Sequence, residues 1–114
     1  SSVGKARIND GNATVDVREA ESNIGFWQID GIVSEDMMSV ETRIYVAVTA
    51  GDTTKYYEAF GITDDTTDCG YRLYLDKDSE KSDNITISVY VSDGNSDICV
   101  AQQDVDLTSV ETLN

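Results

Sequence analysis

Apolar and polar residues alternate along several stretches of the chain, with the two-residue period of a β-strand. Four stretches carry apolar residues at every second position. These rows are Trp27, Ile29, Gly31 and Val33; Ile44, Val46 and Val48; Tyr71, Leu73 and Leu75; and Ile85, Ile87, Val89 and Val91. Alternation with one apolar face is typical of antiparallel sheets that bury one side. The four rows therefore predict two packed sheets, with Trp27 filling the core rather than contacting a ligand.

Turn-forming residues separate these stretches at regular intervals. Three short polar segments, Asn9–Asn12, Ala50–Thr53 and Asp93–Ser96, contain glycine and lie between predicted strands. Glycine beside Asp or Asn suits the backbone of a tight hairpin. This spacing predicts about eight short strands in an antiparallel sandwich or barrel. Helix is expected only as a single turn within Ser34–Val40, where Ser34 is placed to cap it.

Composition and charge support a small β domain and exclude some partners. The β-branched residues Ile, Val and Thr outnumber Leu, Ala and Met among the 114 residues, which favours strands over helices. We interpret residues 1–114 as a single β-sandwich module, and its polar ends suggest that it is one module of a longer protein. The net charge of −14 opposes binding to nucleic acid or to an anionic membrane surface. No apolar run is long enough for a transmembrane helix.

The residue types that most often carry enzyme chemistry are scarce. The chain has no His, so it lacks the commonest general base and metal ligand. Without His, neither cysteine has a partner for a zinc site or an activated nucleophile. The acidic loops 64–68 and 76–80 are interpreted as solvated turns rather than as a calcium site, because Asp is a common turn former. We therefore predict a protein that is not an enzyme and has no metal or cofactor.

The two cysteines, Cys69 and Cys99, form either one disulfide or two buried thiols. We predict the disulfide rather than free thiols for a small acidic β domain of this kind. A bridge that closes about 30 residues would stabilise the fold by roughly 3.6 kcal/mol. Parity opposes it, since Cys69 lies in the row of Tyr71 whereas Cys99 alternates with Ile98 and Val100. A bulge or a strand end would be needed to aim the two sulfur atoms at each other.

Three tyrosines, Tyr45, Tyr74 and Tyr90, occupy the outward parity of their predicted strands. A tyrosine offers a flat apolar face and a hydroxyl group, which together suit a sugar ring or a protein partner. The alternative is that each ring only covers its sheet by cross-strand packing. Tyr56, Tyr57 and Phe60 lie on one predicted strand and fall on both of its faces, so at least one of them is expected in the core.

A longer pattern joins several of these stretches. It comprises residues 25–33 (GFWQIDGIV), residues 42–48 (TRIYVAV), the pair Tyr56-Tyr57 and residues 69–75 (CGYRLYL). The pattern resembles the small immunoglobulin-like accessory modules of bacterial cell-envelope and glycan-handling proteins. That resemblance implies an exported, non-catalytic module. It assigns no ligand residue here, because residues 60–63 (FGIT) stand near the place of the Arg-x-Asp-Val step that often occurs in the pattern.

Together these observations predict an all-β, antiparallel immunoglobulin-like sandwich of seven to nine strands. The expected function is that of a non-catalytic binding module, extracellular or at the cell surface, that presents an aromatic sheet face to a glycan or a surface protein. The alternative function is that of a structural spacer in a bacterial surface protein, with no ligand of its own. Strand order decides whether the three outward tyrosines converge.

Overall fold

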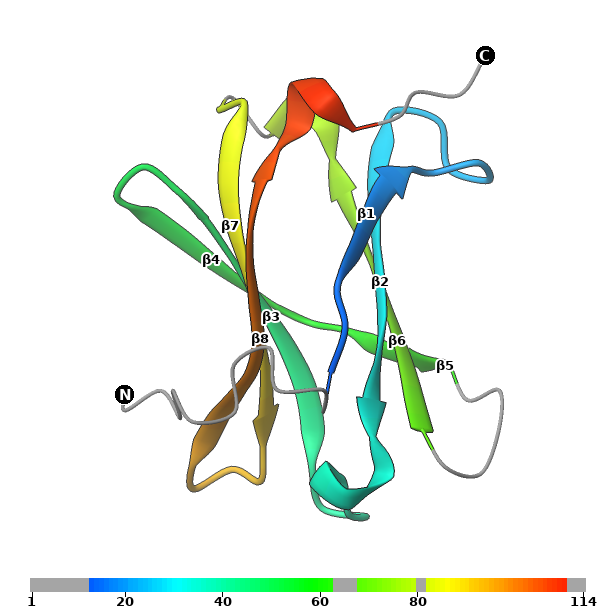
Figure 1. Ribbon diagram of the computed structural model, residues 1–114, viewed down its shortest axis with the longest axis vertical. Helices are drawn as coiled ribbons and strands as arrows, with labels where there is room; N and C mark the ends of the chain where they lie inside the picture. Colours follow the sequence, from blue (N-terminus) through cyan, green and yellow to red (C-terminus); the bar gives the residue numbers. More distant parts are fainter. Residues whose placement is uncertain (1–12, 63–67, 80–81, 111–114) are drawn as a thin grey trace.

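The alternating stretches become strands in the structure, a computed structural model that describes residues 13–62, 68–79 and 82–110 (Figure 1). Within these ranges the chain forms eight strands and three short 3₁₀ turns. The strands are β1 (Asp16–Glu19), β2 (Phe26–Ser34), β3 (Arg43–Ala50), β4 (Thr53–Glu58), β5 (Phe60–Ile62), β6 (Asp68–Asp76), β7 (Asn84–Ser92) and β8 (Asp97–Asp106). The 3₁₀ turns are η2 (Glu35–Met37), η3 (Lys77–Ser79) and η4 (Leu107–Ser109).

The strands form two antiparallel sheets that pack face to face. One sheet has the order β1-β2-β6-β5 and the other has the order β4-β3-β7-β8. Numbered in chain order as A, B, C, C′, D, E, F and G, these orders are A-B-E-D and C′-C-F-G, which is the topology of an immunoglobulin-like sandwich. The fold class expected from the sequence is therefore confirmed. The described residues include no helix that is both long and apolar enough to cross a membrane.

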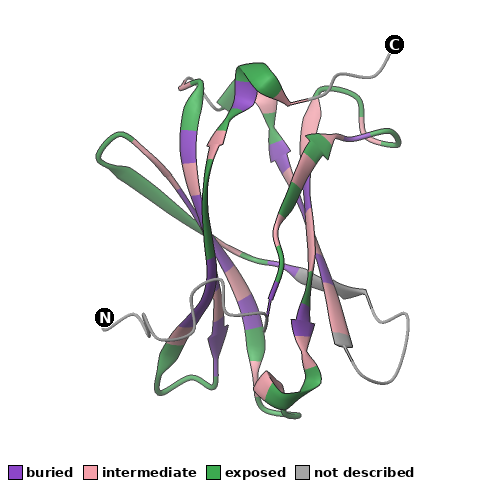
Figure 2. Ribbon diagram, viewed as in Figure 1, coloured by how far each residue is buried: buried purple, intermediate pink, exposed green. Residues whose placement is uncertain are grey.

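The core lies between the sheets and consists mainly of the predicted apolar rows (Figure 2). Val46, Ile87 and Val89 are completely buried, and the rows of β3, β6 and β7 are buried throughout. The row of β2 is less complete, because Trp27 is only partly buried and packs at the margin of the core. Tyr57 also packs against the core, which agrees with the expectation that at least one of Tyr56, Tyr57 and Phe60 points inward.

The structure confirms the predicted turns that fall within the described residues. The hairpin between β3 and β4 turns at Gly51, and the hairpin between β7 and β8 turns at Gly94, each with a positive φ. The single helical turn within 34–40 is η2, although the Ser34 side chain makes no capping hydrogen bond. The predicted turn at 9–12, the strand before it and the acidic residues 64–67 lie outside the described residues.

A close contact between Gly31 and Tyr71 accompanies the hydrogen bonds that hold Thr14 against β2. The two residues are cross-strand partners, and Tyr71 is 1% exposed. The Tyr71 hydroxyl donates a hydrogen bond of 2.7 Å to the Thr14 carbonyl oxygen. Thr14 is also bound to Ile32, through its backbone N–H at 3.0 Å and its hydroxyl oxygen at 3.1 Å. The Tyr71 ring thus lies over a backbone that has no side chain at residue 31.

The predicted disulfide between Cys69 and Cys99 is not formed, and both cysteines are free. A β-bulge leaves Val100 without a partner, so that Tyr90 faces Cys99 while Val89 faces Ala101. Cys99 therefore shares the outward side of Tyr90, whereas Cys69 lies at the start of β6 in the opposite sheet. The bulge that the bridge required does exist, but it turns Cys99 away from the core. The thiol of Cys99 instead donates to the Ala101 carbonyl oxygen at 3.4 Å.

Candidate functional site

Strand order brings two of the three predicted tyrosines together. Tyr45 on β3 and Tyr90 on β7 are direct cross-strand partners, so their side chains lie next to each other on the outward side of the β4-β3-β7-β8 sheet. Tyr74 lies on β6, in the other sheet, and is paired with Gln28. It cannot share a surface with the first two. The predicted trio is therefore a pair and a separate residue.

A third tyrosine, Tyr56, joins the pair from β4. The tight turn at Gly51 sets Ala50 opposite Thr53, and this register places Tyr56 opposite Ala47. Ala47 is two residues from Tyr45 on the same side of β3, so Tyr56 lies diagonally beside Tyr45. Its side chain is 69% exposed, which is unusual for a large aromatic residue of this chain.

These three rings border a hollow of about 280 Å³ on the outward side of the sheet. We call it the tyrosine hollow, and its lining residues are Tyr45, Tyr56, Tyr90, Ser92 and Asp97. Small residues occupy the outward positions between the rings, and they are buried although they face away from the core. These small residues are Ala47, Ser88, Ser92 and Cys99. Because large rings alternate with small side chains, this face of the sheet is hollowed between the rings.

The polar groups of the tyrosine hollow are hydroxyls and one carboxylate. Burial raises the pKa of Tyr90, and the neighbouring Cys99 and Tyr56 raise it further. The Tyr90 hydroxyl therefore keeps its proton at neutral pH and can donate a hydrogen bond. Asp97 begins β8 opposite Ser92 and supplies an acceptor at the border of the hollow. The site thus combines flat apolar surfaces with hydrogen-bonding groups at their edges.

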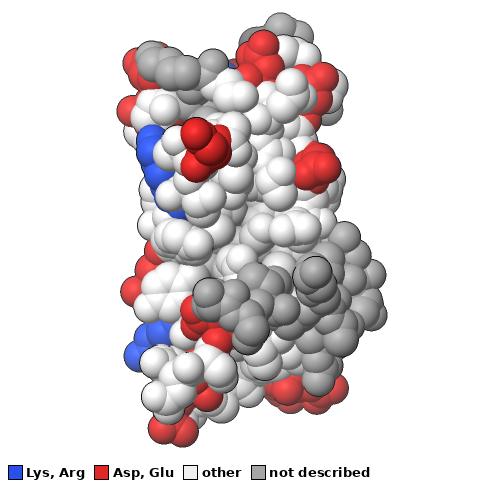
Figure 3. Space-filling view, turned by 90° about the vertical axis from the view of Figure 1, so that its left-hand side faces the viewer, with Lys and Arg blue, Asp and Glu red and all other residues white. Residues whose placement is uncertain are grey.

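Three of the five basic side chains in the described residues pair with carboxylates of β1 and β2, whereas Arg43 and Lys55 belong to β3 and β4. Arg18 and Arg72 both bind Asp30 on the other sheet, at 3.2 Å and 2.7 Å. Lys77 binds Glu19 at 2.8 Å. On the side that carries β4, β7 and β8, acidic groups are scattered over the surface and basic groups lie along one edge of the view (Figure 3). The lining of the tyrosine hollow contains one acidic residue, Asp97, and no basic residue.

Tyr74 has different surroundings from the tyrosine hollow. Its cross-strand partner Gln28 is 5% exposed and donates to Asp30 at 2.6 Å. Asp30 in turn holds the two arginines, so this face of the β1-β2-β6-β5 sheet is occupied by a network of polar side chains that bind one another. A tyrosine within such a network has a structural explanation and needs no ligand.

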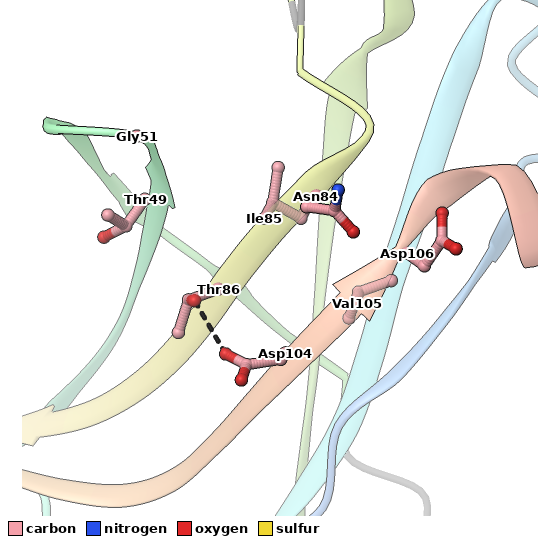
Figure 4. A pocket seen from close by; sticks show the side chains of 8 residues that line it. All are labelled: Thr49, Gly51, Asn84, Ile85, Thr86, Asp104, Val105 and Asp106. Atoms are coloured by element: carbon pink, nitrogen blue, oxygen red, sulfur yellow. Dashed lines mark hydrogen bonds between the residues drawn. The ribbon is translucent and has the colours of Figure 1, made fainter.

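A second hollow, of about 440 Å³, lies between the β3–β4 turn and the adjoining ends of β7 and β8 (Figure 4). Its lining mixes polar side chains with the apolar residues Ile85 and Val105, and Thr86 donates to Asp104 at 2.8 Å. Asp106 lies apart from that pair, and its pKa is lowered because it accepts hydrogen bonds from Thr108. No group of three or more His, Cys, Asp or Glu residues able to hold a metal ion occurs among the residues described. The side chains that line this second hollow therefore do not point toward one common ligand position.

No known protein family matches the sequence, and no curated protein matches it either.

Tyr56 and Asp97 were not among the site residues predicted from the sequence. Of the two, only Tyr56 could have been located from the sequence. The tight turn at Gly51 was recognised from the sequence, and counting back from it pairs Tyr56 with Ala47 and aligns it beside Tyr45. Asp97 had no such signal. Its place beside the tyrosines depends on the pairing of β7 with β8 and on the side that β8 takes before the bulge.

Proposed function

We propose that the protein is a non-catalytic binding module that holds a glycan in the tyrosine hollow. The observation that carries this proposal is the convergence of three tyrosines from three different strands on one outward hollow of about 280 Å³. Sugar rings combine apolar C–H faces with hydroxyl groups at their edges. The hollow offers the complementary arrangement, because its flat rings are bordered by the Ser92 hydroxyl and the Asp97 carboxylate.

A glycan suits this surface better than a large protein partner. Stable protein interfaces bury roughly 1,600 Å² in total and need an apolar centre. Beyond the tyrosine hollow, the outward positions of the same sheet are polar. They include Thr49, Thr54, Thr86, Gln102 and Asp104. The apolar contact surface is therefore confined to the hollow, which has the size of a small ligand site.

The proposed location is extracellular or at the cell surface. It rests on the resemblance to immunoglobulin-like accessory modules of bacterial envelope proteins and on the matching strand order. The cysteines give no support to this location, because they are unpaired.

The spacer function is a second candidate, favoured by the path of the described chain. Ala13 pairs with Val33 at the end of β2, whereas β8 ends beside the start of β7, so the chain enters and leaves at opposite ends of the sandwich (Figure 1). A domain with this path can hold neighbouring segments apart. A spacer would bind no glycan, so a binding measurement separates the two candidates.

The test is a glycan array followed by titration of the retained oligosaccharides, with the native protein and with Tyr56→Ala. Tyr56 is mostly exposed, so its removal should cost less than about 1 kcal/mol of folding stability. Loss of stacking worth about 1 kcal/mol should weaken binding at least about fivefold. Absence of any retained glycan on the native protein would refute the proposed glycan-binding function.

Tyr74→Ala is the matched control, because it removes the same side chain from the opposite sheet. Its affinity for the retained glycan should equal that of the native protein. If Tyr74→Ala lost binding and Tyr56→Ala did not, the site would lie on the other face. Thermal denaturation of both variants shows whether either change acts through unfolding.

A further inference from the structure

We infer that the glycan held in the tyrosine hollow carries protonated amino groups, as an oligosaccharide of glucosamine does. This inference rests on the proposed function and adds the charge of the ligand to it. Its basis is the combination of three aromatic rings and a carboxylate in a lining that contains no basic side chain.

The lining of the tyrosine hollow carries negative charge, and the basic residues Arg43 and Lys55 lie on β3 and β4 outside that lining. Asp97 lines it, and Glu58 is the cross-strand partner of Tyr45. The whole chain carries a net charge of −14. A ligand with carboxylate, sulfate or phosphate groups would be repelled, whereas a cation would be attracted before contact.

Aromatic rings add a second, short-range attraction for a cation. The face of a tyrosine ring carries partial negative charge and attracts an ammonium group within about 6 Å of its centre. A carboxylate on the other side of the ammonium group can accept its hydrogen bonds. Tyr45, Tyr56 and Tyr90 supply the rings, and Asp97 supplies the carboxylate.

The same combination of groups already exists elsewhere in the molecule. The Lys77 ammonium lies 4.4 Å from the centre of the Trp27 ring and 2.8 Å from the Glu19 carboxylate. There, ring, cation and carboxylate all come from the chain itself. In the tyrosine hollow the chain provides rings and a carboxylate, and the inferred ligand provides the cation.

A neighbouring basic residue, Arg43, does not fill this role. It lies on the outward side of β3, two residues before Tyr45 and opposite Ser92. Its guanidinium group donates to the carbonyl oxygens of Thr42 at 3.0 Å and Val40 at 3.5 Å. The side chain is therefore directed to the loop before β3, and it is not part of the lining.

A basic peptide would satisfy the charge but not the rest of the surface. The hydroxyls of Ser92 and of the tyrosines border the rings and match the ring hydroxyls of a sugar. The polar surroundings on the same sheet give a peptide chain little apolar surface to cover. An amino sugar uses both the charge and the hydroxyl groups of the site.

The test compares two oligosaccharides of equal length by isothermal titration at low ionic strength. One is a glucosamine tetramer at a pH where its amines are protonated, and the other is the N-acetylglucosamine tetramer, which is neutral. The native protein should bind the charged tetramer at least about tenfold more tightly, because it gains a charge-assisted hydrogen bond and cation–π contacts.

Asp97→Asn and Asp104→Asn form a matched pair of variants. Each removes one negative charge from the outward side of β8, but only Asp97 lines the tyrosine hollow. Asp97→Asn should weaken binding of the charged tetramer about tenfold and leave the neutral tetramer unchanged. Asp104→Asn should change both affinities less than twofold, since an exposed charge outside the site is screened by solvent.

A second pair of variants tests the role of the ring. Tyr56→Phe keeps an aromatic face and should retain most of the affinity for the charged tetramer. Tyr56→Leu keeps apolar surface without the ring and should weaken binding about two- to fivefold, which corresponds to an exposed cation–π contact. Equal loss in both variants would show that the hydroxyl, and not the ring, carries the contact.

The possible outcomes separate this inference from the function on which it rests. Preference for the charged tetramer with dependence on Asp97 supports it. Equal binding of both tetramers, or no effect of Asp97→Asn, overturns the inference and leaves glycan binding in place. Binding of neither tetramer while the array retains other glycans also overturns it, and binding of no glycan refutes the proposed function itself. Binding of an oligolysine peptide instead of both sugars, with the same dependence on Asp97, would assign the hollow to a basic protein partner.

Discussion

Replacement of Gly31 by Ala should be among the most damaging small changes in this protein. A Cβ atom at residue 31 would collide with the Thr14 carbonyl oxygen and would lie 2.5 Å from two atoms of the Tyr71 ring and hydroxyl. Neither neighbour can easily move. Thr14 is hydrogen-bonded to Ile32 at two points, and Tyr71 is 1% exposed.

The magnitude follows from what must be displaced. Forcing a methyl group into a packed site costs about 1–3 kcal/mol. Moving Tyr71 away also breaks its hydrogen bond to Thr14, which is worth roughly 0.5–1.5 kcal/mol. We therefore expect Gly31→Ala to lower the free energy of unfolding by about 2–4 kcal/mol. For a domain of this size each kcal/mol lowers Tm by roughly 4 °C or more, so Tm should fall by at least about 8 °C.

The assay is urea denaturation followed by the fluorescence of Trp27, the single tryptophan of the chain. Trp27 lies on the same strand as Gly31, so its signal reports this region. Gly94→Ala is the control, because its added Cβ would meet nothing and would only strain a backbone with φ of 93°. It should cost about 1 kcal/mol.

A double-mutant cycle identifies the cause of the loss. Tyr71→Leu removes the ring atoms that a Cβ at residue 31 would meet, so it should cost less in the Gly31→Ala background than in the native protein. If Gly31→Ala unfolded at the same urea concentration as the native protein, the close packing of Tyr71 on residue 31 would be disproved. Additive effects of the two substitutions would show that Thr14 alone makes the clash.

Other predictions concern ionisation and the thiols. Thiol titration of the denatured, unreduced chain should find two free sulfhydryls. In the native state Cys99 should react far more slowly than Cys69, because Cys99 is fully buried. Equal reaction rates of the two thiols would contradict this burial. Burial raises the pKa of Tyr71 and Tyr90 in the folded state, so the unfolded chain loses protons first and stability should decline as pH rises above about 10. Tyr71→Phe should flatten that decline, and an unchanged slope in alkaline urea titrations would argue against it. Backbone N–H groups of the β7–β8 turn lower the pKa of Asp93, so its contribution should be present above about pH 4 and lost as pH falls further; Asp93→Asn should reduce the dependence of Tm on pH between about 2 and 4.

The sequence was sufficient for the strands and their buried faces because the alternation of apolar residues is local. Ile85, Ile87, Val89 and Val91 all became buried, and turns at glycine-containing segments set the hairpin between β7 and β8. Strand order was not accessible in the same way. Whether β6 pairs with β2 or with a strand of the other sheet depends on contacts between segments about 40 residues apart, for which no local pattern exists.

The disulfide prediction failed on the parity that already opposed it. Cys99 lies on the outward side, as its alternation with Ile98 and Val100 indicates, although alternation with Ala101 would place it inward. The bulge adds one unpaired residue at Val100, and a shift of one residue moves a side chain to the opposite face. No residue type around Val100 marks this bulge in the sequence. It became visible only when the pairing of Tyr90 with Cys99 was known.

The tyrosine hollow shows how parity and pairing contribute separately to a site. Parity predicted that Tyr45, Tyr74 and Tyr90 face outward, and it could not distinguish among them. Pairing then placed Tyr74 in the other sheet and brought Tyr56 beside Tyr45. The same bulge that prevented the disulfide set Cys99 among the small outward residues between the tyrosine rings. If the proposed site is correct, replacing one of these small outward residues by a larger one should block ligand binding. The protein should still fold, because the inward apolar residues are unchanged. Ser92, which lines the tyrosine hollow and is 8% exposed, is the position where such a change is most informative.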